Sequence, residues 1–307
     1  MIGSIIPMEP VLHQEAFNDP NFIFEVKWDG VRILALVDRN TVQLVNKRQR
    51  RRTEQYPELL QLTRLVTKQP AILDGEVVAL KNGLPSFPAV IQRDRCSSAR
   101  SIKSGILSNP INYMVFDILY CQGRSLLDWS LSQRKELLDQ IIRPNNIAFT
   151  VDGFVDGEIL FTEIKKRGME GMVAKRKASP YTQGKHHHDW FKIKNFRYQM
   201  CVIGGYTMDG NRINSLLLGA FREKQLVYVG KAGTGLKANE WEVMAAELEK
   251  RRINHSPFVN LISQKGGHFV QPQICVKVKF LEWTEHLHLR SPVIVGFSSL
   301  HPDQCQI

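Results

Sequence analysis

One stretch of strand-forming residues carries four charged side chains. Residues 22–36 read FIFEVKWDGVRILAL, in which bulky and β-branched residues are interrupted by Glu25, Lys27, Asp29 and Arg32. The apolar residues suit a pleated surface, and the Asp-Gly pair is a turn signal. We therefore predict a strand, a tight turn and a second strand that pairs with the first and holds Lys27 near Arg32. A lysine held beside other charges is a candidate nucleophile, and the alternative is an exposed lysine on an ordinary hairpin.

Further stretches place ionisable or aromatic side chains on or beside predicted strands. A charged group inside a buried strand requires a partner or a function. The stretches are LDGEVVAL with Glu76, just past a predicted Asp-Gly turn; YMVFDILY with Phe116 and Asp117; EGMVAK with Glu170 and Lys175; and DWFKIKN with Lys192 and Lys194 on one strand face. Each is weak evidence alone, but the order and spacing of all of them together are informative.

In this order the stretches resemble the motifs of the nucleotidyltransferase superfamily, which comprises ATP-dependent DNA ligases, RNA ligases and mRNA capping enzymes. KWDGVR, from Lys27 to Arg32, is similar to the nucleophile motif, and FDILY, EGMVAK and KIK are similar to motifs that follow it. The tail GYTMDGNRINSLLLGAF…LVYVGKAGTGL resembles the OB domain of bacterial ATP-dependent ligases. The likeness is greatest to the ligase module of bacterial end-joining ligases that work with Ku.

We predict an α+β fold with two domains, a ligase-type adenylation (nucleotidyltransferase) domain over residues 1–197 and a small OB-fold β-barrel over residues 198–307. Strands and helices alternate in the first part, and short strands punctuated by glycine follow it. The predicted helices are 130–142 with a Ser130–Gln133 capping box, 156–168 ending at Gly168, and 238–252 with Asn239 as N-cap; the predicted strands include 71–80, 111–120 and 274–283.

The resemblance implies a role for each motif residue. Lys27 would attack the α-phosphate of ATP and become lysyl-AMP, AMP would pass to a DNA 5′-phosphate, and a 3′-hydroxyl would then displace AMP. The implied nucleotide contacts are Glu25 to adenine, Phe116 stacked on the purine, Arg32, Glu76 near the ribose, Lys192 and Lys194 on the α-phosphate, and Lys47 or Arg48 on the ribose or substrate. Glu170, with Glu76, would hold Mg²⁺ or Mn²⁺.

A protonated lysine cannot attack a phosphate. We expect burial, the nearby cations Arg32, Lys192 and Lys194, and a bound metal to disfavour the charged form of Lys27. The family's NAD-dependent members carry an extra domain before the motif lysine. With 26 residues before Lys27, we expect ATP as the donor.

The charge of the chain favours a nucleic-acid partner. The net charge is +11, from 41 Lys and Arg against 30 Asp and Glu, and part of it clusters in residues 46–52 and 192–197. We expect nicked or broken double-stranded DNA as substrate, Ku as a further partner, and a monomer. We find neither a signal peptide nor an apolar run near the ~20 residues that span a bilayer. The five cysteines are scattered, so we expect reduced thiols in a cytosol. The resemblance implies a bacterial, nucleoid-associated protein of the cytoplasm.

Two alternatives remain: an RNA ligase or capping guanylyltransferase, and a non-catalytic, DNA-binding pseudoligase. Two motifs also depart from the family. NKRQRRRT has Lys47 where arginine is common and Arg51 where aspartate is common, and the final Arg-x-Asp-Lys motif is replaced by Ser298, Leu300 and His301. Three consecutive histidines precede the KIK motif, and we predict a polar loop there, because the spacing of a tetrahedral metal site is absent.

Overall fold

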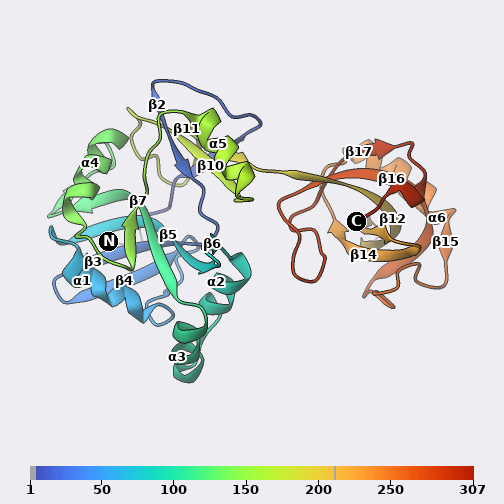
Figure 1. The fold of residues 1–307 in the computed structure, drawn as a ribbon, viewed down its shortest axis with the longest axis horizontal. Coiled ribbons are helices and arrows are strands. Elements are labelled where there is room, and N and C mark those ends of the chain that lie inside the picture. Colours follow the sequence, from blue (N-terminus) through green and yellow to red (C-terminus); the bar gives the residue numbers. More distant parts are fainter. Residues whose placement is uncertain (1–4, 211) are drawn as a thin grey trace. The chain divides into compact units, whose positions relative to one another are not determined.

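The computed structural model describes residues 5–210 and 212–307, and the chain divides into two compact units, residues 1–195 and 196–307 (Figure 1). The division lies two residues before the predicted boundary. Residues 1–4 are part of the N-terminus in which we expect no signal peptide, and they lie outside the described residues. Among the residues described, no helix combines the length and the apolar composition needed to cross a membrane.

The first unit contains a large sheet with the strand order β4-β3-β5-β7-β8, in which β6 pairs with β5 and β9 pairs with β7. The strands are β3 (Val31–Asp38), β4 (Thr41–Asn46), β5 (Ala71–Lys81), β6 (Leu84–Pro85), β7 (Ile111–Cys121), β8 (Arg124–Ser125) and β9 (Ala148–Thr150). The associated helical segments are η2 (Pro57–Gln61), α1 (Leu62–Leu65), α2 (Phe87–Asp94), α3 (Ala99–Ser108) and α4 (Leu131–Ile141). Their apolar faces bury one core, which includes Ile33, Leu44, Leu73, Val115 and Leu138.

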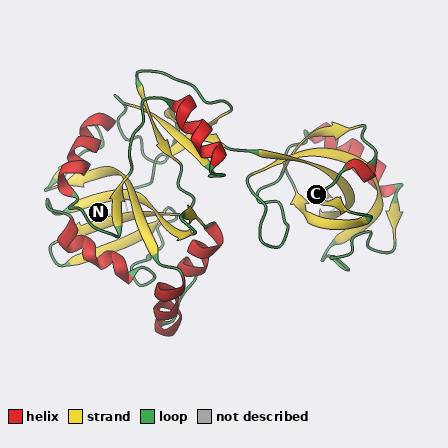
Figure 2. Cartoon of the chain, viewed as in Figure 1, coloured by secondary structure: helices red, strands yellow, loops and turns green. Residues whose placement is uncertain are grey.

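A smaller sheet completes the first unit, and α5 packs on it (Figure 2). Its strand order is β1-β11-β10-β2. The elements are β1 (Glu9–His13), β2 (Phe22–Val26), α5 (Gly157–Lys166), β10 (Gly171–Arg176) and β11 (His186–Lys194). The three histidines therefore begin strand β11, and the prediction of a loop at this place is wrong.

The predicted pairing of the strands on either side of the KWDG turn is also wrong. Strand β2 pairs with β10 in the small sheet, whereas β3 pairs with β5 in the large sheet. The segment between them crosses from one sheet to the other, and the backbone N–H of Lys27 donates to Gly171 O at 2.9 Å. Glycine is required at this crossing, because a Cβ on Gly30 would lie 2.2 Å from Val77 O.

The second Asp-Gly pair does not form the predicted turn either. Strand β5 runs through Asp74 and Gly75 without interruption. A Cβ on Gly75 would lie 2.6 Å from the ring of Tyr113 in β7. The glycine therefore permits a close approach of a ring to the backbone within the sheet, and Glu76 lies inside the strand and not after a turn.

Two of the three features predicted at helix ends are confirmed. The side chains of Ser130 and Gln133 form the capping box of α4, and α5 is followed by Gly168 with a φ of +65°. The start predicted for the third helix is wrong, because the N-cap of α6 (Ala238–Glu249) is Lys237 and not Asn239. The backbone N–H of Lys237 donates to the Glu240 carboxylate at 2.6 Å, so an acid three residues into the helix determines where it begins.

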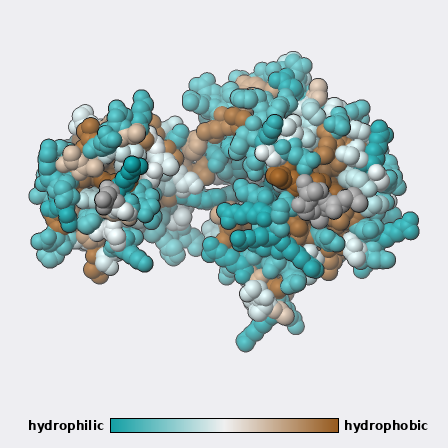
Figure 3. Space-filling model, turned by 180° about the vertical axis from the view of Figure 1, so that it is seen from behind, coloured by the Kyte–Doolittle hydropathy of each residue, from teal (hydrophilic) through white to brown (hydrophobic). Residues whose placement is uncertain are grey.

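The second unit is the small β-barrel predicted from its short strands. The antiparallel order is β14-β13-β12-β16-β15, and β17 also pairs with β16. The elements are β12 (Arg197–Asp209), β13 (Arg212–Arg222), β14 (Gln225–Ala232), β15 (Arg252–Ile253), β16 (Gly267–Phe280), β17 (Val293–Ser298) and η3 (Pro302–Gln304). Met244 and Leu248 of α6 pack into its core with Leu216, Val276 and Val278. Hydrophilic residues cover much of the visible surface of each unit in the space-filling view (Figure 3).

Candidate active site

The two sheets of the first unit contribute to one pocket of about 600 Å³, a volume typical of nucleotide-sized ligands. The small sheet supplies β2, β10 and β11, and the large sheet supplies β3, β5 and β7. The lining includes nearly every residue selected from the sequence: Glu25, Lys27, Arg32, Lys47, Arg48, Glu76, Phe116, Lys192 and Lys194, together with Glu9, Arg50, Lys175 and Trp190. Glu170, the remaining selected residue, reaches the pocket through its contact with Lys27.

Lys27 lies at the end of β2 and its ammonium is paired with a carboxylate. Nζ is 2.6 Å from Oε2 of Glu170, and Nζ of Lys194 is 3.3 Å from the other oxygen of the same carboxylate. The Glu170 side chain is 6% exposed and that of Lys27 is 24% exposed. Glu170 therefore bridges two lysines that were selected independently from the sequence.

Burial and attraction act in opposite directions on the charge of Lys27. Burial lowers the pKa of Lys27, as expected, but attraction to Glu170, Glu76 and Asp29 outweighs burial and raises the pKa above its ordinary value. The sequence analysis considered the cations of nearby motifs and not these carboxylates. Its expectation also includes a bound metal and stays a prediction for the metal-bound site.

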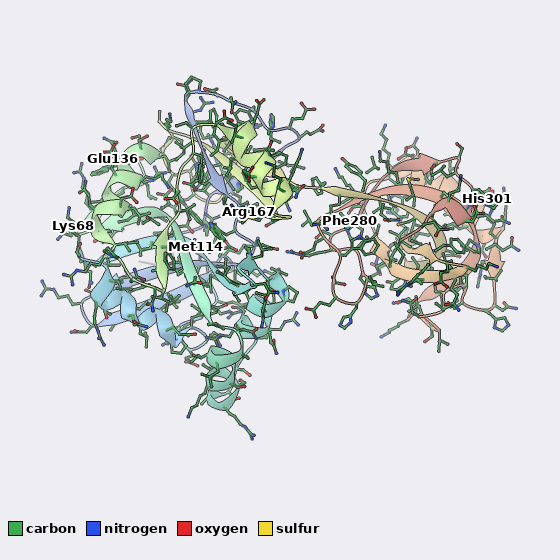
Figure 4. All side chains as sticks on the ribbon, in the orientation of Figure 1. Lys68, Met114, Glu136, Arg167, Phe280 and His301 are labelled. Carbon is green, nitrogen blue, oxygen red and sulfur yellow. The ribbon has the colours of Figure 1, made fainter. Side chains whose placement is uncertain are left out.

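Glu76 is the second carboxylate beside Lys27. It lies opposite Arg32 in the register of β3 and β5, and opposite Met114 in β7, which Figure 4 labels. Burial raises the pKa of Glu76 to about 8, although Lys27 and Arg32 act to lower it. Glu76 therefore holds its proton to a higher pH than an exposed carboxyl group does.

Arg32 is engaged by a buried network that the sequence did not predict. Nε and Nη2 donate to the two oxygens of Asp74 at 3.0 and 2.7 Å, and Nη1 donates to Met8 O at 2.7 Å. The Tyr181 hydroxyl donates to Asp74 at 2.6 Å. Asp74 and Tyr181 therefore fix the guanidinium at the pocket wall. The signal that could have revealed this network was an aspartate within an otherwise apolar strand, which requires a buried partner.

Glu25 is likewise held by two lysines, of which the sequence analysis singled out Lys175 but not Lys135. Its side chain is 2% exposed, and its two oxygens lie 2.6 Å from Nζ of Lys135 and 2.5 Å from Nζ of Lys175. Lys175 follows Glu170 on β10, but Lys135 comes from α4. Nothing in the spacing of Glu25 and Lys135 along the chain indicates that they touch.

Phe116 is an extra residue at an irregularity in the pairing of β5 and β7, because Asp74 lies opposite Asp117 and Gly75 lies opposite Val115. Phe116 lines the pocket, with Nζ of Lys175 at 4.4 Å and Cζ of Arg32 at 5.3 Å from its ring centroid. Asp117 accepts from Nε and Nη2 of Arg134 at 2.7 and 3.0 Å, and both side chains are fully buried. The buried aspartate of this motif is therefore explained by an ion pair behind the pocket.

The remaining cations form one side of the pocket. Burial lowers the pKa of Lys192, Glu9 acts to raise it, and Lys194, Lys27 and Lys47 lower it further. Lys47 is 60% exposed and lies 3.9 Å from Glu9, and Arg48 is also exposed. Either Lys47 or Arg48 can reach a ligand in the pocket, so the choice between them stays open.

Glu170 and Glu76 are suited to holding a divalent cation. Both carboxyl groups act on the same ammonium, that of Lys27, so a positive charge already lies between them. Mg²⁺ prefers oxygen ligands and often takes only one or two carboxylates besides phosphate oxygens. Among residues 5–210 and 212–307, no group of three or more His, Cys, Asp or Glu side chains forms a metal site by itself.

The residues that replace the final family motif lie at the end of the second unit. Ser298 ends β17, and its hydroxyl accepts from Leu300 N at 3.2 Å. Nδ1 of His301 lies 2.6 Å from Oδ1 of Asp303, and both side chains are largely exposed (Figure 4). The backbone of Phe221 in β13 then bonds to Cys305 and Ile307, which fixes the tail on the barrel.

Comparison with known proteins agrees with this arrangement. Residues 9–194 match the family model for the ATP dependent DNA ligase domain, and residues 209–300 match that for the ATP dependent DNA ligase C terminal region. The protein named multifunctional non-homologous end joining DNA repair protein LigD of Mycobacterium tuberculosis is 33% identical over 92% of this chain, and the match spans 36% of that protein. The chain thus spans about a third of the length of this relative.

Other similar proteins are closer to this chain in length. The SPbeta prophage-derived DNA ligase-like protein LigB of Bacillus subtilis is 31% identical over 91% of this chain and 93% of its own. A solved structure, mycobacterial DNA ligase D complexed with ATP and MES, matches with a TM-score of 0.57 and 29% identity over 99% of each chain. A structure of Lig E DNA ligases gives a TM-score of 0.66 at 16% identity over 96% of this chain and 100% of its own, which supports the fold alone.

Proposed function

The chain belongs to the family of ATP-dependent DNA ligases, and from this premise we propose that it seals 5′-phosphate/3′-hydroxyl breaks in duplex DNA through lysyl-AMP on Lys27. The observation that carries the proposal is the position of Lys27, whose ammonium lies in a pocket of nucleotide size beside Glu170, Arg32 and the lysines of β11. The relatives named for non-homologous end joining support a role in bacterial end joining.

We assign the chemistry of the first step to Lys27. Its Nζ forms a bond to the α-phosphorus of ATP, the bond from that phosphorus to the bridging oxygen breaks, and pyrophosphate leaves. The ammonium, which donates to Oε2 of Glu170, must lose one proton to solvent before the attack and a second as the phosphoramidate forms. Lys192 and Lys194 supply positive charge beside the phosphate as the transition state forms.

We propose that Glu170 and Glu76 hold Mg²⁺ or Mn²⁺. The ion would supply positive charge to the phosphates and compete with Lys27 for the two carboxylates. Glu76, with its pKa raised to about 8, would bind the ion with loss of its proton. Replacement of Glu170 by alanine should weaken the dependence on divalent metal more than the binding of nicked DNA, and unchanged turnover across a Mg²⁺ titration would exclude Glu170 as a ligand.

The donor nucleotide is tested by covalent labelling. AMP-free protein is incubated with Mg²⁺ and α-labelled ATP or GTP and then separated on a denaturing gel. We expect a labelled band with ATP. Label from GTP alone would indicate a capping-type enzyme, and the absence of label from either nucleotide would indicate a pseudoligase. Sealing of nicked DNA is then compared with sealing of nicked RNA.

We propose nicked or broken duplex DNA as the substrate, bound through phosphate contacts by the basic clusters at 46–52 and 192–197. Binding should weaken steeply with salt, with a log–log slope of about −0.9 per phosphate neutralised. A flat response would show that these clusters do not contact DNA. We also propose that the chain acts as a monomer at the bacterial nucleoid with Ku as a partner, which sedimentation and a pull-down with purified Ku would test.

A further inference from the structure

We propose that Lys135 and Lys175 are positioning residues that make Glu25 select a purine with an exocyclic amine over one with a carbonyl at the same carbon. The inference rests on the proposed function, because it concerns the nucleotide that Lys27 attacks. It goes beyond that function in assigning specificity to Lys135, which lies outside the motifs that identify the family, and to Lys175, the last residue of the EGMVAK motif.

Lys135 is fixed in place by two hydrogen bonds. It extends from α4, the helix that Figure 4 marks at the neighbouring Glu136, toward the small sheet. Its Nζ donates to Oε1 of Glu25 at 2.6 Å and to the carbonyl oxygen of Val151 at 2.7 Å. The side chain is 14% exposed and Val151 is itself a pocket residue. Lys135 therefore holds Glu25 from behind the pocket wall.

Lys175 approaches the other oxygen of Glu25 from β10. Its Nζ is 2.5 Å from Oε2, yet it is not aligned for a hydrogen bond, and it lies 4.4 and 4.5 Å from the ring centroids of Phe116 and Trp190. The positive charge of the Lys175 ammonium lies beside the carboxylate, but its N–H donors have no hydrogen-bond acceptor among the described residues. These donors suit a ring nitrogen of a bound base.

Nζ of Lys135 and Nζ of Lys175 approach different oxygens of the Glu25 carboxylate, whose side chain is 2% exposed. An ionised carboxylate accepts hydrogen bonds and cannot donate one. The 6-amino group of adenine can donate to it, whereas the 6-carbonyl of guanine or hypoxanthine would place an oxygen against a negative charge. A site built to hydrogen-bond an NH group can reject an analogue without it by ~10⁴–10⁵.

A purely structural ion cluster is the competing explanation, because buried salt bridges occur without a role in binding. The two explanations differ in one measurable quantity. Loss of a structural cluster would reduce adenylation with every nucleotide by the same factor. Loss of a positioning residue would change the ratio between nucleotides.

The experiment compares self-adenylation by ATP and by inosine triphosphate, which carries a carbonyl in place of the amine. Rates are measured on AMP-free enzyme over a range of nucleotide concentrations, for the wild type, Lys135→Met and Lys135→Arg. We expect Lys135→Met to lower the ATP-to-ITP preference by about tenfold or more, mainly through KM for ATP, since about 1.4 kcal/mol of discrimination is one decade. Lys135→Arg, which keeps the charge, should restore part of the preference.

Two further variants complete the test. Glu25→Gln replaces a carboxylate, which only accepts hydrogen bonds, with an amide that both donates and accepts. This variant should therefore use ITP better, relative to ATP, than the wild type does. It tests the inference even if Lys135→Met is poorly folded. Lys166→Met removes an exposed lysine paired with Glu163 on α5 and should leave the preference unchanged. An unchanged ATP-to-ITP ratio in both Lys135→Met and Glu25→Gln would overturn the inference. Absence of covalent adenylate in the wild type with either nucleotide would instead overturn the proposed function.

Discussion

The two units of the chain differ in what they bury. Among residues 5–210 and 212–307, the buried charged side chains all belong to the first unit: Glu25, Asp74, Arg93, Asp117, Arg134 and Lys175. The buried polar side chains described in the barrel are Thr207 and Ser215, whose hydroxyls bond to each other at 2.6 Å. Burial of a charge is unfavourable unless it is paired. The barrel shows that this chain can form a compact unit with an apolar interior, so the buried charges of the first unit require another explanation.

The pocket explains most of the buried charges in the first unit. Glu25 and Lys175 line it, and Asp74 fixes Arg32 at its wall. Asp117 pairs with Arg134 beside Phe116 on β7, and neither residue lines the pocket. Arg93 is an exception, because it pairs with Glu58 and does not line the pocket. The comparison of the two units indicates that the other buried charges position groups around a ligand.

The largest expected difference between the two units is in covalent adenylation, which depends on Lys27. Lys27→Ala should abolish covalent adenylation and leave the fold intact, because it removes the nucleophile from a pocket wall and opens no core cavity. The matched change in the barrel is Lys231→Ala, on the exposed side of β14, which should adenylate normally. Both variants are assayed with labelled ATP and by circular dichroism. Normal label incorporation by Lys27→Ala would refute the assignment of the nucleophile.

The buried ion pair behind the pocket provides the largest difference in stability. Arg134→Met should lower the free energy of unfolding by about 3–5 kcal/mol, because it leaves Asp117 buried without its partner. Thr207→Val in the barrel removes one neutral hydrogen bond and should cost about 1 kcal/mol. Urea unfolding measures both. Equal losses would mean that buried charge has no special role in the first unit.

The barrel also lacks the basic residues of the family's final motif, and this should slow one step only. Ser298, Leu300 and His301 cannot orient a departing pyrophosphate as Arg-x-Asp-Lys would. Loss of one such donor commonly costs ~10²–10³ in rate. We expect slow self-adenylation, with sealing of a pre-adenylated nick less affected.

Restoration of the motif tests this expectation directly. The triple variant Ser298→Arg, Leu300→Asp and His301→Lys should accelerate adenylation of AMP-free enzyme and leave sealing of pre-adenylated nicks unchanged. AMP must be removed first, because protein isolated as lysyl-AMP would hide the defect. If the unmodified enzyme adenylates as fast as it seals and the triple variant adds nothing, another residue supplies the missing charge.

The last expected effect is on the pH dependence of stability. Burial raises the pKa of Glu76 from 4.5 to about 8, against the pull of Lys27 and Arg32. Between these values the folded state keeps a proton that the unfolded state has lost, so stability should fall as pH rises through this window. Urea unfolding of metal-free protein at pH 5 to about 8 measures the slope, and Glu76→Gln should flatten it.

A carboxylate of the barrel gives the opposite sign. Hydrogen bonds from Arg251 and Lys250 lower the pKa of Glu247 on α6, so its contribution is lost as pH falls. Glu247→Gln should therefore leave the slope above pH 5 unchanged. A flat profile for the wild type over this window would show that Glu76 is ionised in the metal-free protein.

Local patterns in the sequence predicted much of this molecule. The capping box at Ser130 and Gln133 and the short strands of the barrel after residue 197 follow from interactions over a few residues. The ordered motifs likewise identified the residues that converge on the pocket. Their individual roles in catalysis and binding stay predictions until the variants above are measured.

Which distant segments of the chain pair with each other could not be predicted from such local patterns. The Asp-Gly pair at Asp29 suggested a hairpin, but β2 and β3 pair with strands in different sheets. A turn signal describes four residues, whereas strand pairing depends on which surfaces the whole unit buries.

The sequence by itself determined which residues could perform the chemistry, because the motifs specify their types and order. Only the tertiary structure decided their charge states and their positioning partners. Lys27 is held protonated by Glu170, 143 residues away, and Glu25 is held by Lys135, 110 residues away. Electrostatic interactions depend on distance through space and on exclusion of water, and neither quantity is encoded in the spacing of residues along the chain.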